Sequence, residues 1–157
     1  MKIFKIFRNQ KGFTLIELLV VIGILAVLLS VTLIAINPAR QFAQANNTKR
    51  RSDVSGILNA INQYMADKKG VVPPGGIAAT DKDISNVAGQ ADICASLVTQ
   101  YLAALPVDPK TNNGASITNC AAVGYTTHYH VTQSVADNRI TVSAPDAELL
   151  EVISVTR

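Results

Sequence analysis

The hydrophobic positions of this 157-residue chain form one uninterrupted block, followed by stretches with a helical and then a strand-like period. No Asp, Glu, Lys or Arg occurs from Leu18 to Ala39, where nearly every residue is Leu, Ile, Val or Ala. An uncharged apolar run of about 20 residues is long enough to span a bilayer, and residues 13–36 would rise about 36 Å as a helix. The block therefore predicts a transmembrane helix over residues 13–36.

Helical spacing continues beyond this block but becomes amphipathic. Asn37 and Pro38 interrupt the run, and a proline at such a place either bends or breaks a helix. The apolar residues that recur at helical spacing after it are Val54, Ile57, Leu58, Ile61, Tyr64 and Met65. Lys68-Lys69-Gly70 is a stop signal. We expect one helix from about Phe13 to about Lys68, with residues 37–69 as its amphipathic continuation.

Residues 70–157 predict a globular head, which begins with Pro- and Gly-rich sequence that cannot be helical. Apolar spacing predicts a short helix over residues 92–105, with Asp92 as its N-cap and Pro106 at its end. This helix would bury one apolar face in the head.

The last third of the chain has a period of two. Apolar and polar residues alternate over 123–131, and turn signals separate this run from apolar stretches at 140–144 and 149–155. We expect a three-stranded antiparallel meander that packs on the amphipathic half of the long helix. The fold class is therefore α+β.

Charge is concentrated before the apolar block. Hydrophobic residues make up 48% of the chain and charged residues only 16%. Four of the 14 basic side chains precede Phe13, which leaves ten basic against 11 acidic ones; the four are Lys2, Lys5, Arg8 and Lys11. The net positive charge of the whole chain thus comes from the segment before Phe13, which we interpret as a leader. No nucleic-acid partner is predicted. The same charges predict a cytoplasmic N-terminus and an outside head, because only Arg40 is comparably close on the other side.

One acidic residue, Glu17, lies in the apolar helix. A carboxylate costs about 2.5–3.5 kcal/mol at the centre of a membrane helix and less near its end, so it suggests a function with a specific partner. An ordinary secretory signal has a shorter apolar core and a small-x-small cleavage site, which this sequence lacks. An ordinary signal anchor fits the length of the segment but does not explain Glu17.

The run from Lys11 to Leu25, KGFTLIELLVVIGIL, resembles the class III signal sequence of type IV pilins and type II secretion pseudopilins. The resemblance covers about the first third of the chain and implies a pilin fold. It also implies that a membrane prepilin peptidase cuts between Gly12 and Phe13 on the cytoplasmic side, removing residues 1–12. The same enzyme would methylate the new amino group of Phe13.

The resemblance implies a structural subunit of a type IV pilus or a related filament. Glu17 lies one helical turn from Phe13 on the same face, so it can pair with the Phe13 ammonium of a neighbouring subunit. The expected partners are the prepilin peptidase, other pilin subunits, an inner-membrane assembly platform and membrane lipid. The subunit would be a single-pass membrane protein before assembly and part of a cell-surface or periplasmic filament afterwards. A secretion pseudopilin and a DNA-uptake pilin remain the alternatives.

The segment Leu105-Pro106-Val107-Asp108-Pro109 is similar to a Leu-Pro-x-Asp-Pro segment of major pseudopilins and many pilins. Pseudopilins of this kind often bind calcium in a nearby loop. Asp108 alone is a poor site, since calcium takes 6–8 oxygen ligands, and residues 110–114 depart from the family pattern. We therefore expect no metal, and we interpret Asp108 as a turn residue between two prolines.

Other polar candidates receive structural interpretations. His128 and His130 are expected to point to solvent from one strand, because no third metal ligand is evident. Lys49-Arg50-Arg51 is interpreted as a solvated face or as inter-subunit charge pairing, in preference to a lipid or DNA contact. No Ser/His/Asp arrangement, Gly-rich phosphate loop or Cys-x-x-Cys motif occurs, so neither an enzyme nor a cofactor is expected.

Cys94 and Cys120 are the only cysteines, and both fall in the part predicted to lie outside, where disulfides persist. We expect them to form a bridge, as many pilins carry one disulfide in the head. It would close a loop of about 27 residues and contribute roughly 3–4 kcal/mol on the chain-entropy account.

Overall fold

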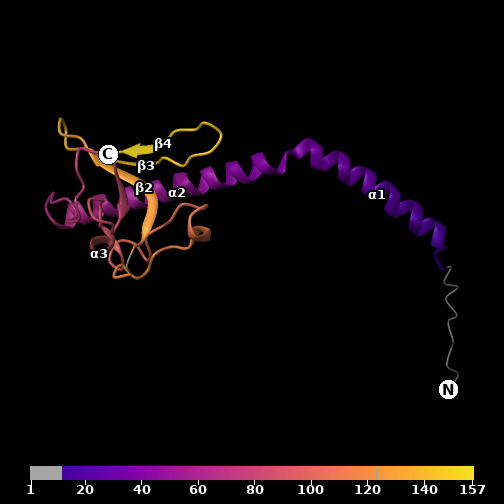
Figure 1. Ribbon diagram of the computed structural model, residues 1–157, viewed down its shortest axis with the longest axis horizontal. Coiled ribbons are helices and arrows are strands. Elements are labelled where there is room, and N and C mark those ends of the chain that lie inside the picture. Colours follow the sequence, from indigo (N-terminus) through magenta and orange to yellow (C-terminus); the bar gives the residue numbers. More distant parts are fainter. Residues whose placement is uncertain (1–11, 123) are drawn as a thin grey trace, which may run out of the picture. The chain divides into compact units, whose positions relative to one another are not determined.

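The computed structural model describes residues 12–122 and 124–157, and the chain divides into two compact units between Gln41 and Phe42. The predicted leader charges at Lys2, Lys5, Arg8 and Lys11, and Val123 of the predicted first strand, lie outside the described residues. The elements are α1 (Leu15–Ile36), α2 (Pro38–Asp67), β1 (Lys82–Ser85), α3 (Cys94–Leu97), η1 (Asn112–Gly114), β2 (Thr126–Gln133), β3 (Ile140–Ala144) and β4 (Ile153–Thr156) (Figure 1).

The helical segment is broken at Asn37. This residue takes the left-handed conformation, with φ 47° and ψ 80°. Pro38 then begins α2, because its fixed φ and missing N–H suit the first position of a helix. The side-chain oxygen of Asn37 accepts a hydrogen bond from the Arg40 N–H at 3.3 Å and so helps to cap α2. The single helix expected from Phe13 to Lys68 is therefore two helices, divided at the Asn-Pro pair.

The end of α2 confirms the predicted stop signal. The last helical residue is Asp67, and Lys69 and Gly70 follow with φ values of 55° and 90°. The Gly70 N–H donates to the Met65 carbonyl at 2.7 Å, which is the long-range bond of a Schellman cap. The left-handed turn directs the chain away from the helix axis.

The predicted apolar stripe of α2 forms one side of the core of the head. Its fully buried members are Val54, Ile57, Leu58 and Ile61, with Tyr64 and Met65 partly buried beside them. The sheet contributes Tyr129, Val131, Ile140 and Val142 to the same cluster. Burying one large apolar side chain contributes about 1.5–3 kcal/mol, so this layer holds the helix on the sheet. A hydrogen bond of 2.8 Å from the Tyr129 hydroxyl to Asp53 adds a polar link across it.

The sheet is an antiparallel meander with the strand order β1-β2-β3-β4. The α+β class is confirmed, but the sheet has four strands where three were expected. The predicted strand at 140–144 matches β3, and the alternation of buried and half-exposed residues along β2 agrees with the predicted period of two. The strand expected at 149–155 begins only at Ile153, because residues 145–152 form a loop.

The strand that the sequence did not reveal, β1, is short and polar. Among its four residues only Ile84 is a buried apolar side chain, so no alternating apolar pattern marks it. It lies at the edge of the sheet, where short and charged strands are common. Its pairing with β2 is irregular between Asp83 and Ser85, and His128 in β2 has a φ of 59° in that stretch.

The prediction of a helix over residues 92–105 is wrong beyond the first turn. Only Cys94–Leu97 is helical, and Val98 is already extended, with φ −70° and ψ 142°. Leu97 and Leu105 are nevertheless fully buried, because single β-bridges replace the helix, one of them pairing Leu105 with Ile117. Asp92 makes no cap; its side chain accepts a hydrogen bond from the Tyr125 hydroxyl at 2.6 Å.

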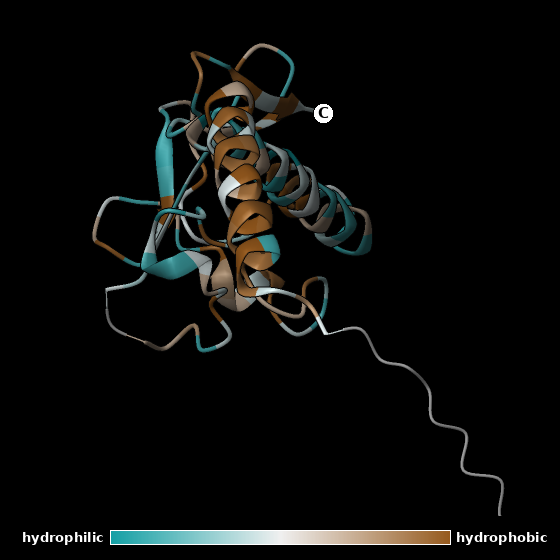
Figure 2. Ribbon diagram, turned by 90° about the vertical axis from the view of Figure 1, so that its right-hand side faces the viewer, coloured by the Kyte–Doolittle hydropathy of each residue, from teal (hydrophilic) through white to brown (hydrophobic). Residues whose placement is uncertain are grey.

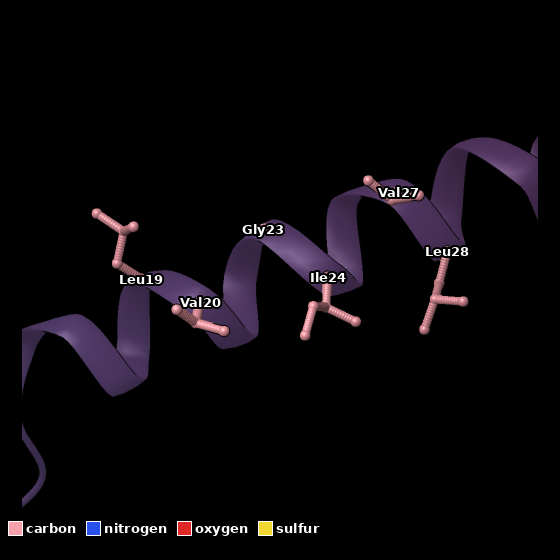
Figure 3. Close-up of a pocket in the computed structure, with 6 residues that line it drawn as sticks. All are labelled: Leu19, Val20, Gly23, Ile24, Val27 and Leu28. Carbon is pink, nitrogen blue, oxygen red and sulfur yellow. The ribbon is translucent and has the colours of Figure 1, made fainter.

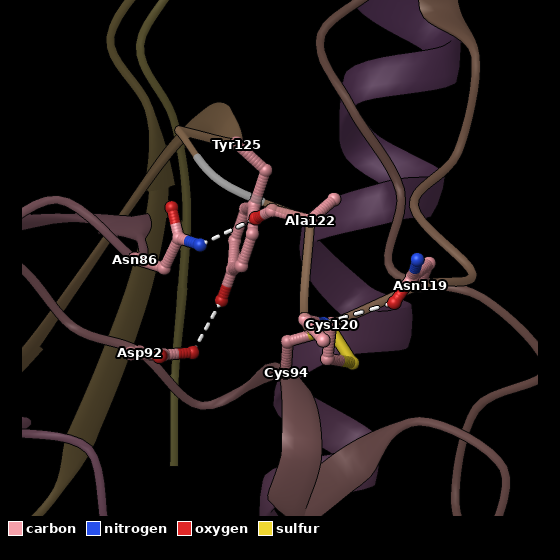
Figure 4. The surroundings of a disulfide bond; sticks show 8 residues. Asn86, Asp92, Cys94, Asn119, Cys120, Ala122 and Tyr125 are labelled. Atoms are coloured by element: carbon pink, nitrogen blue, oxygen red, sulfur yellow. Dashed lines mark hydrogen bonds between the residues drawn. A yellow bond between two sulfur atoms is a disulfide. The ribbon is translucent and has the colours of Figure 1, made fainter.

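Cys94 and Cys120 form the predicted disulfide, with their Cα atoms 5.5 Å apart (Figure 4). Cys94 is fully buried at the start of α3. The bridge ties this short helix to the loop that precedes β2, beside the Tyr125–Asp92 hydrogen bond. It therefore joins two segments that have little regular secondary structure of their own.

Replacing both cysteines, as Cys94→Ala with Cys120→Ala, is expected to lower the free energy of unfolding by about 3 kcal/mol, because the unfolded chain regains the freedom of the closed loop. Chemical denaturation of the mature chain in detergent micelles, followed by tyrosine fluorescence, measures the loss. The matched control is the unaltered chain with and without reductant, which must show the same difference. Equal stability of the oxidised and reduced chains would contradict the prediction.

Candidate functional site

The N-terminal end of α1 is built around Thr14 and Glu17. Thr14 is the N-cap, and its hydroxyl oxygen accepts a hydrogen bond from the Glu17 N–H at 3.3 Å. In return, Glu17 Oε2 accepts from the Thr14 N–H at 2.8 Å and from the Thr14 hydroxyl at 2.6 Å. This capping box satisfies amides that the start of a helix leaves without intrahelical partners. The Glu17 carboxylate, which is costly to place in a membrane, thus has a hydrogen-bond donor within its own chain.

Gly12 and Phe13 precede the cap as an exposed segment. The Phe13 side chain is 88% exposed. A Cβ atom built on Gly12 would meet no other atom within 4 Å. Packing among the described residues therefore does not explain why a glycine and an aromatic residue stand here.

The helix that follows is apolar around its whole circumference. None of the 22 residues of α1 is buried, and its ribbon is coloured hydrophobic along nearly its full length (Figure 2). By length and composition, this helix is able to cross a membrane. Gly23 leaves a shallow hollow on its surface, bordered by Leu19, Val20, Ile24, Val27 and Leu28 (Figure 3). Such a hollow allows another apolar helix to approach closely.

Comparison with known protein families matches residues 7–33 to the prokaryotic N-terminal methylation motif. The match covers 27 of the 157 residues, at the N-terminal end of the chain. The methylation motif is typical of type IV pilins and pseudopilins, so the predicted family resemblance is confirmed for this segment. The match includes Gly12, Phe13 and Glu17 and most of α1. No curated protein and no solved structure matches the chain.

Beyond the methylation motif, the head contains a buried charge cluster that sequence reasoning missed. Arg50 is fully buried, and its Nε and Nη2 atoms donate to the two carboxylate oxygens of Asp108 at 2.6 and 3.0 Å. Its Nη1 atom donates to Glu148 and to Asn47, both at 3.0 Å. Asp108 is also fully buried. The bidentate pair fixes α2 to the loop after Pro106, and the bond to Glu148 fixes it to the loop between β3 and β4.

The interpretation of Lys49-Arg50-Arg51 as a solvated or inter-subunit face is wrong for Arg50. Lys49 pairs with Asp53 at 2.9 Å, and Arg51 pairs with Glu151. A signal for the burial of Arg50 existed: it lies four residues before Val54, on the apolar stripe of α2. The pattern of basic residues obscured that position because three cations in a row suggest an exposed surface.

Asp108 has the predicted role in a turn and also forms the ion pair with Arg50. Its Oδ1 atom accepts a hydrogen bond from the Lys110 N–H at 2.9 Å, as in an Asx turn. Because both carboxylate oxygens are also bound by Arg50, they face a guanidinium rather than open space. In the part of the chain that the structure describes, no group of three or more His, Cys, Asp or Glu residues is arranged to hold a metal ion.

His128 and His130 lie on the half-exposed face of β2, as expected. The Nδ1 atom of His128 is 3.0 Å from Asp146, and that of His130 contacts Asp81. Each histidine therefore has its own carboxylate, on a different loop.

The buried cluster predicts sensitivity to acid. The hydrogen bond from Lys110, followed by those from Asn46 and Arg50, lowers the pKa of Glu148 to about 2 from 4.5. A carboxyl group with a lowered folded pKa stabilises the fold above its unfolded pKa, and that contribution is lost as the pH falls through the folded value. We expect the melting temperature of the head to fall between pH 4.5 and about 2.

Glu148→Gln is expected to flatten this acid dependence, because the glutamine does not titrate. Thermal denaturation of the mature chain in detergent at several pH values measures it. Glu151→Gln is the control, since it removes only the exposed pair with Arg51. An acid profile of Glu148→Gln that matches the unaltered chain would contradict the prediction.

Proposed function

We propose that this chain is a prepilin whose mature form is a structural subunit of a type IV pilus or a related filament. The observation that carries the proposal is the methylation motif over residues 7–33, which includes most of a 22-residue helix with no buried residue. Such a helix needs lipid around it before assembly and other apolar helices around it afterwards. The motif family is structural, and the proposal assigns no catalysis to the chain.

In this proposal, a membrane prepilin peptidase cuts between Gly12 and Phe13 and methylates the Phe13 amino group. The exposed segment before the Thr14 cap supports the cut, because a protease needs an extended chain that is free of packing. The N-terminus is cytoplasmic and the head lies outside. An inner-membrane assembly platform then adds the subunit to a filament made with other pilin subunits.

The intact mass of the mature protein tests the proposal. The chain is expressed together with an aspartic prepilin peptidase, and its mass is expected to correspond to residues 13–157 plus one methyl group. Gly12→Val is expected to stay uncut, because a branched side chain does not fit where glycine lies extended. Gly23→Val, which changes a glycine inside α1, is the matched control and should be processed. An uncut or differently cut unaltered chain would refute the proposal.

A second candidate function is that of a pseudopilin in protein secretion. The observation in its favour is the Leu-Pro-Val-Asp-Pro segment at residues 105–109. The engagement of Asp108 by Arg50 weakens it as the start of a calcium loop. Secretion assays and electron microscopy of cells that lack the protein separate the two functions: loss of long surface filaments favours the pilus, and loss of secretion alone favours the pseudopilin.

A further inference from the structure

The two histidines of the chain stand together on one strand. His128 and His130 are the only histidines in the sequence, and both belong to β2. They alternate with the buried residues Thr127, Tyr129 and Val131, so both side chains leave the same, half-exposed face of the sheet. Residues two apart on a strand are separated by about 6.6 Å, which lets two imidazole rings reach one ion.

Each imidazole ring is bound by a carboxylate at Nδ1. The Nδ1 atom of His128 lies 3.0 Å from Asp146, and that of His130 contacts Asp81. Because a carboxylate only accepts hydrogen bonds, a neutral ring carries its proton on Nδ1 and keeps a lone pair on Nε2. Histidines that bind a metal almost always have such a partner, since it fixes the orientation of the ring and raises its basicity. The two pairs therefore present two Nε2 atoms as ligands.

Strand β2 is irregular where the histidines lie. Asp83 of β1 pairs with His130, but Ser85, two residues later, pairs with Thr126, which lies four residues earlier on β2. The additional residues form a bulge that contains His128, whose φ of 59° is in the left-handed region. Bulges and backbone strain of this kind often occur beside functional sites, where they redirect a side chain.

Asp83 adds a negative charge with an unused oxygen beside this bulge. Its Oδ2 atom accepts from the Thr126 hydroxyl, whereas its Oδ1 atom is buried and accepts no hydrogen bond from the described residues. Because Asp83 lies opposite His130 and reaches Thr126, its carboxylate lies along the bulge. An ion or an ordered water usually accounts for a buried carboxylate oxygen that has no donor.

We propose that His128 and His130 form a binding site for a divalent transition-metal ion, Zn²⁺ or Cu²⁺. Imidazole nitrogen suits these ions, whereas Mg²⁺ and Ca²⁺ take oxygen ligands. Within residues 12–122 and 124–157, no group of three or more His, Cys, Asp or Glu residues could hold the ion. Two positions of a tetrahedral zinc are therefore left for water or for a group of another molecule, and a metal-bound water can donate to Asp83 Oδ1. The proposal depends neither on processing nor on filament assembly.

Isothermal titration of the full 157-residue chain with Zn²⁺, in detergent micelles and without an affinity tag, tests the site. One ion is expected to bind per chain. His128→Gln and His130→Gln are each expected to remove saturable binding, because only one imidazole ligand is then left. No zinc binding by the unaltered chain, or binding that is equally tight in either histidine variant, would overturn the proposal.

The carboxylates that orient the rings are tested in the same titration. Asp81→Asn combined with Asp146→Asn is expected to weaken zinc binding about tenfold, which is the usual effect of losing such partners. Asp137→Asn is the matched control, since Asp137 lies in the β2–β3 turn and accepts from the Arg139 N–H. An equal effect of the control would overturn the orienting role of Asp81 and Asp146.

A second measurement uses the unaltered chain, so it does not depend on a variant that folds. Cu²⁺ is added to the chain labelled with ¹⁵N-histidine, and the electron paramagnetic resonance spectrum of the bound ion is recorded. Coupling to two ¹⁵N nuclei is expected, one from each imidazole. Coupling to one histidine nitrogen, or to none, would overturn the two-histidine site.

Discussion

Replacing Arg50 by methionine is expected to lower the free energy of unfolding of the head by about 3–5 kcal/mol, which is the usual result of removing one partner from a buried ion pair. Asp108 is fully buried and would lose both of its charged donors. Methionine retains much of the arginine stem, so lost packing contributes little to the effect. Most of the loss arises because a carboxylate stays in the core without a positive partner.

The variant Arg51→Met supplies the control. Arg51 is the next residue on α2, but its side chain is 54% exposed and its pair with Glu151 lies at the surface, where such pairs contribute about 0–1 kcal/mol. The double variant Arg50→Met with Asp108→Leu is expected to recover part of the loss, because no charge is then left buried. Denaturation of the mature chain in detergent, followed by tyrosine fluorescence, compares the three. If Arg50→Met were as mild as Arg51→Met, the buried cluster would not stabilise the head.

Glu17→Ala is expected to abolish filament formation while leaving processing after Gly12 intact. In the apolar core of the proposed filament, the carboxylate would have a strong preference for a positive partner, and the methylated ammonium of Phe13 from a neighbouring subunit would supply it. Among the residues that the structure describes, Glu17 is bound only by the Thr14 cap. In the proposed filament, assembly would replace a weak local donor with a charged one, and the variant would remove that gain.

Two further variants separate charge from capping. Glu17→Gln keeps an oxygen that can accept from the Thr14 N–H, but it carries no charge, so we expect no filaments from it either. Ser30→Ala is the matched control, because the Ser30 hydroxyl already donates to the Ala26 carbonyl within α1 at 2.8 Å and needs no partner from another subunit. Electron microscopy of sheared surface material scores filaments, and intact mass confirms processing. Normal filaments from Glu17→Gln would exclude the ion pair.

The parts of the fold that the sequence predicts are those where one local pattern decides the outcome. The stripe from Val54 to Met65, the stop after Asp67 and the strand at Ile140–Ala144 each follow from a short periodicity or a turn signal. The Cys94–Cys120 bridge was predictable because no other cysteine exists. In the N-terminal motif, Gly12, Phe13 and Glu17 are unusual for their surroundings, which makes them visible without a structure.

The parts that the sequence did not predict depend on contacts distant along the chain. Arg50 is buried because Asp108, 58 residues away, and Glu148, 98 residues away, meet it in the core. No local pattern around Arg50 contains that information. Its place on the apolar stripe of α2 was visible, but the partners were not.

The same limit explains two of the errors of secondary structure. Apolar spacing over residues 92–105 has the period of a helix, yet the disulfide at Cys94 and the bridge between Leu105 and Ile117 bury the same side chains in a non-helical path. Strand β1 forms because β2 offers it a free edge, and its own sequence carries little β pattern.

The Cys94–Cys120 bridge also limits how far the head can be stretched. If tension unfolded the segment from Phe42 to Arg157, the 26-residue span between the two cysteines could not lengthen beyond the reach of the bridge itself, 5.5 Å between Cα atoms. At about 3.3 Å per extended residue, the closed span withholds roughly 80 Å of contour length from the pulled chain. A subunit under load would therefore extend in two short arms on either side of a closed loop, and reduction of the bridge would release the remaining length in a single step.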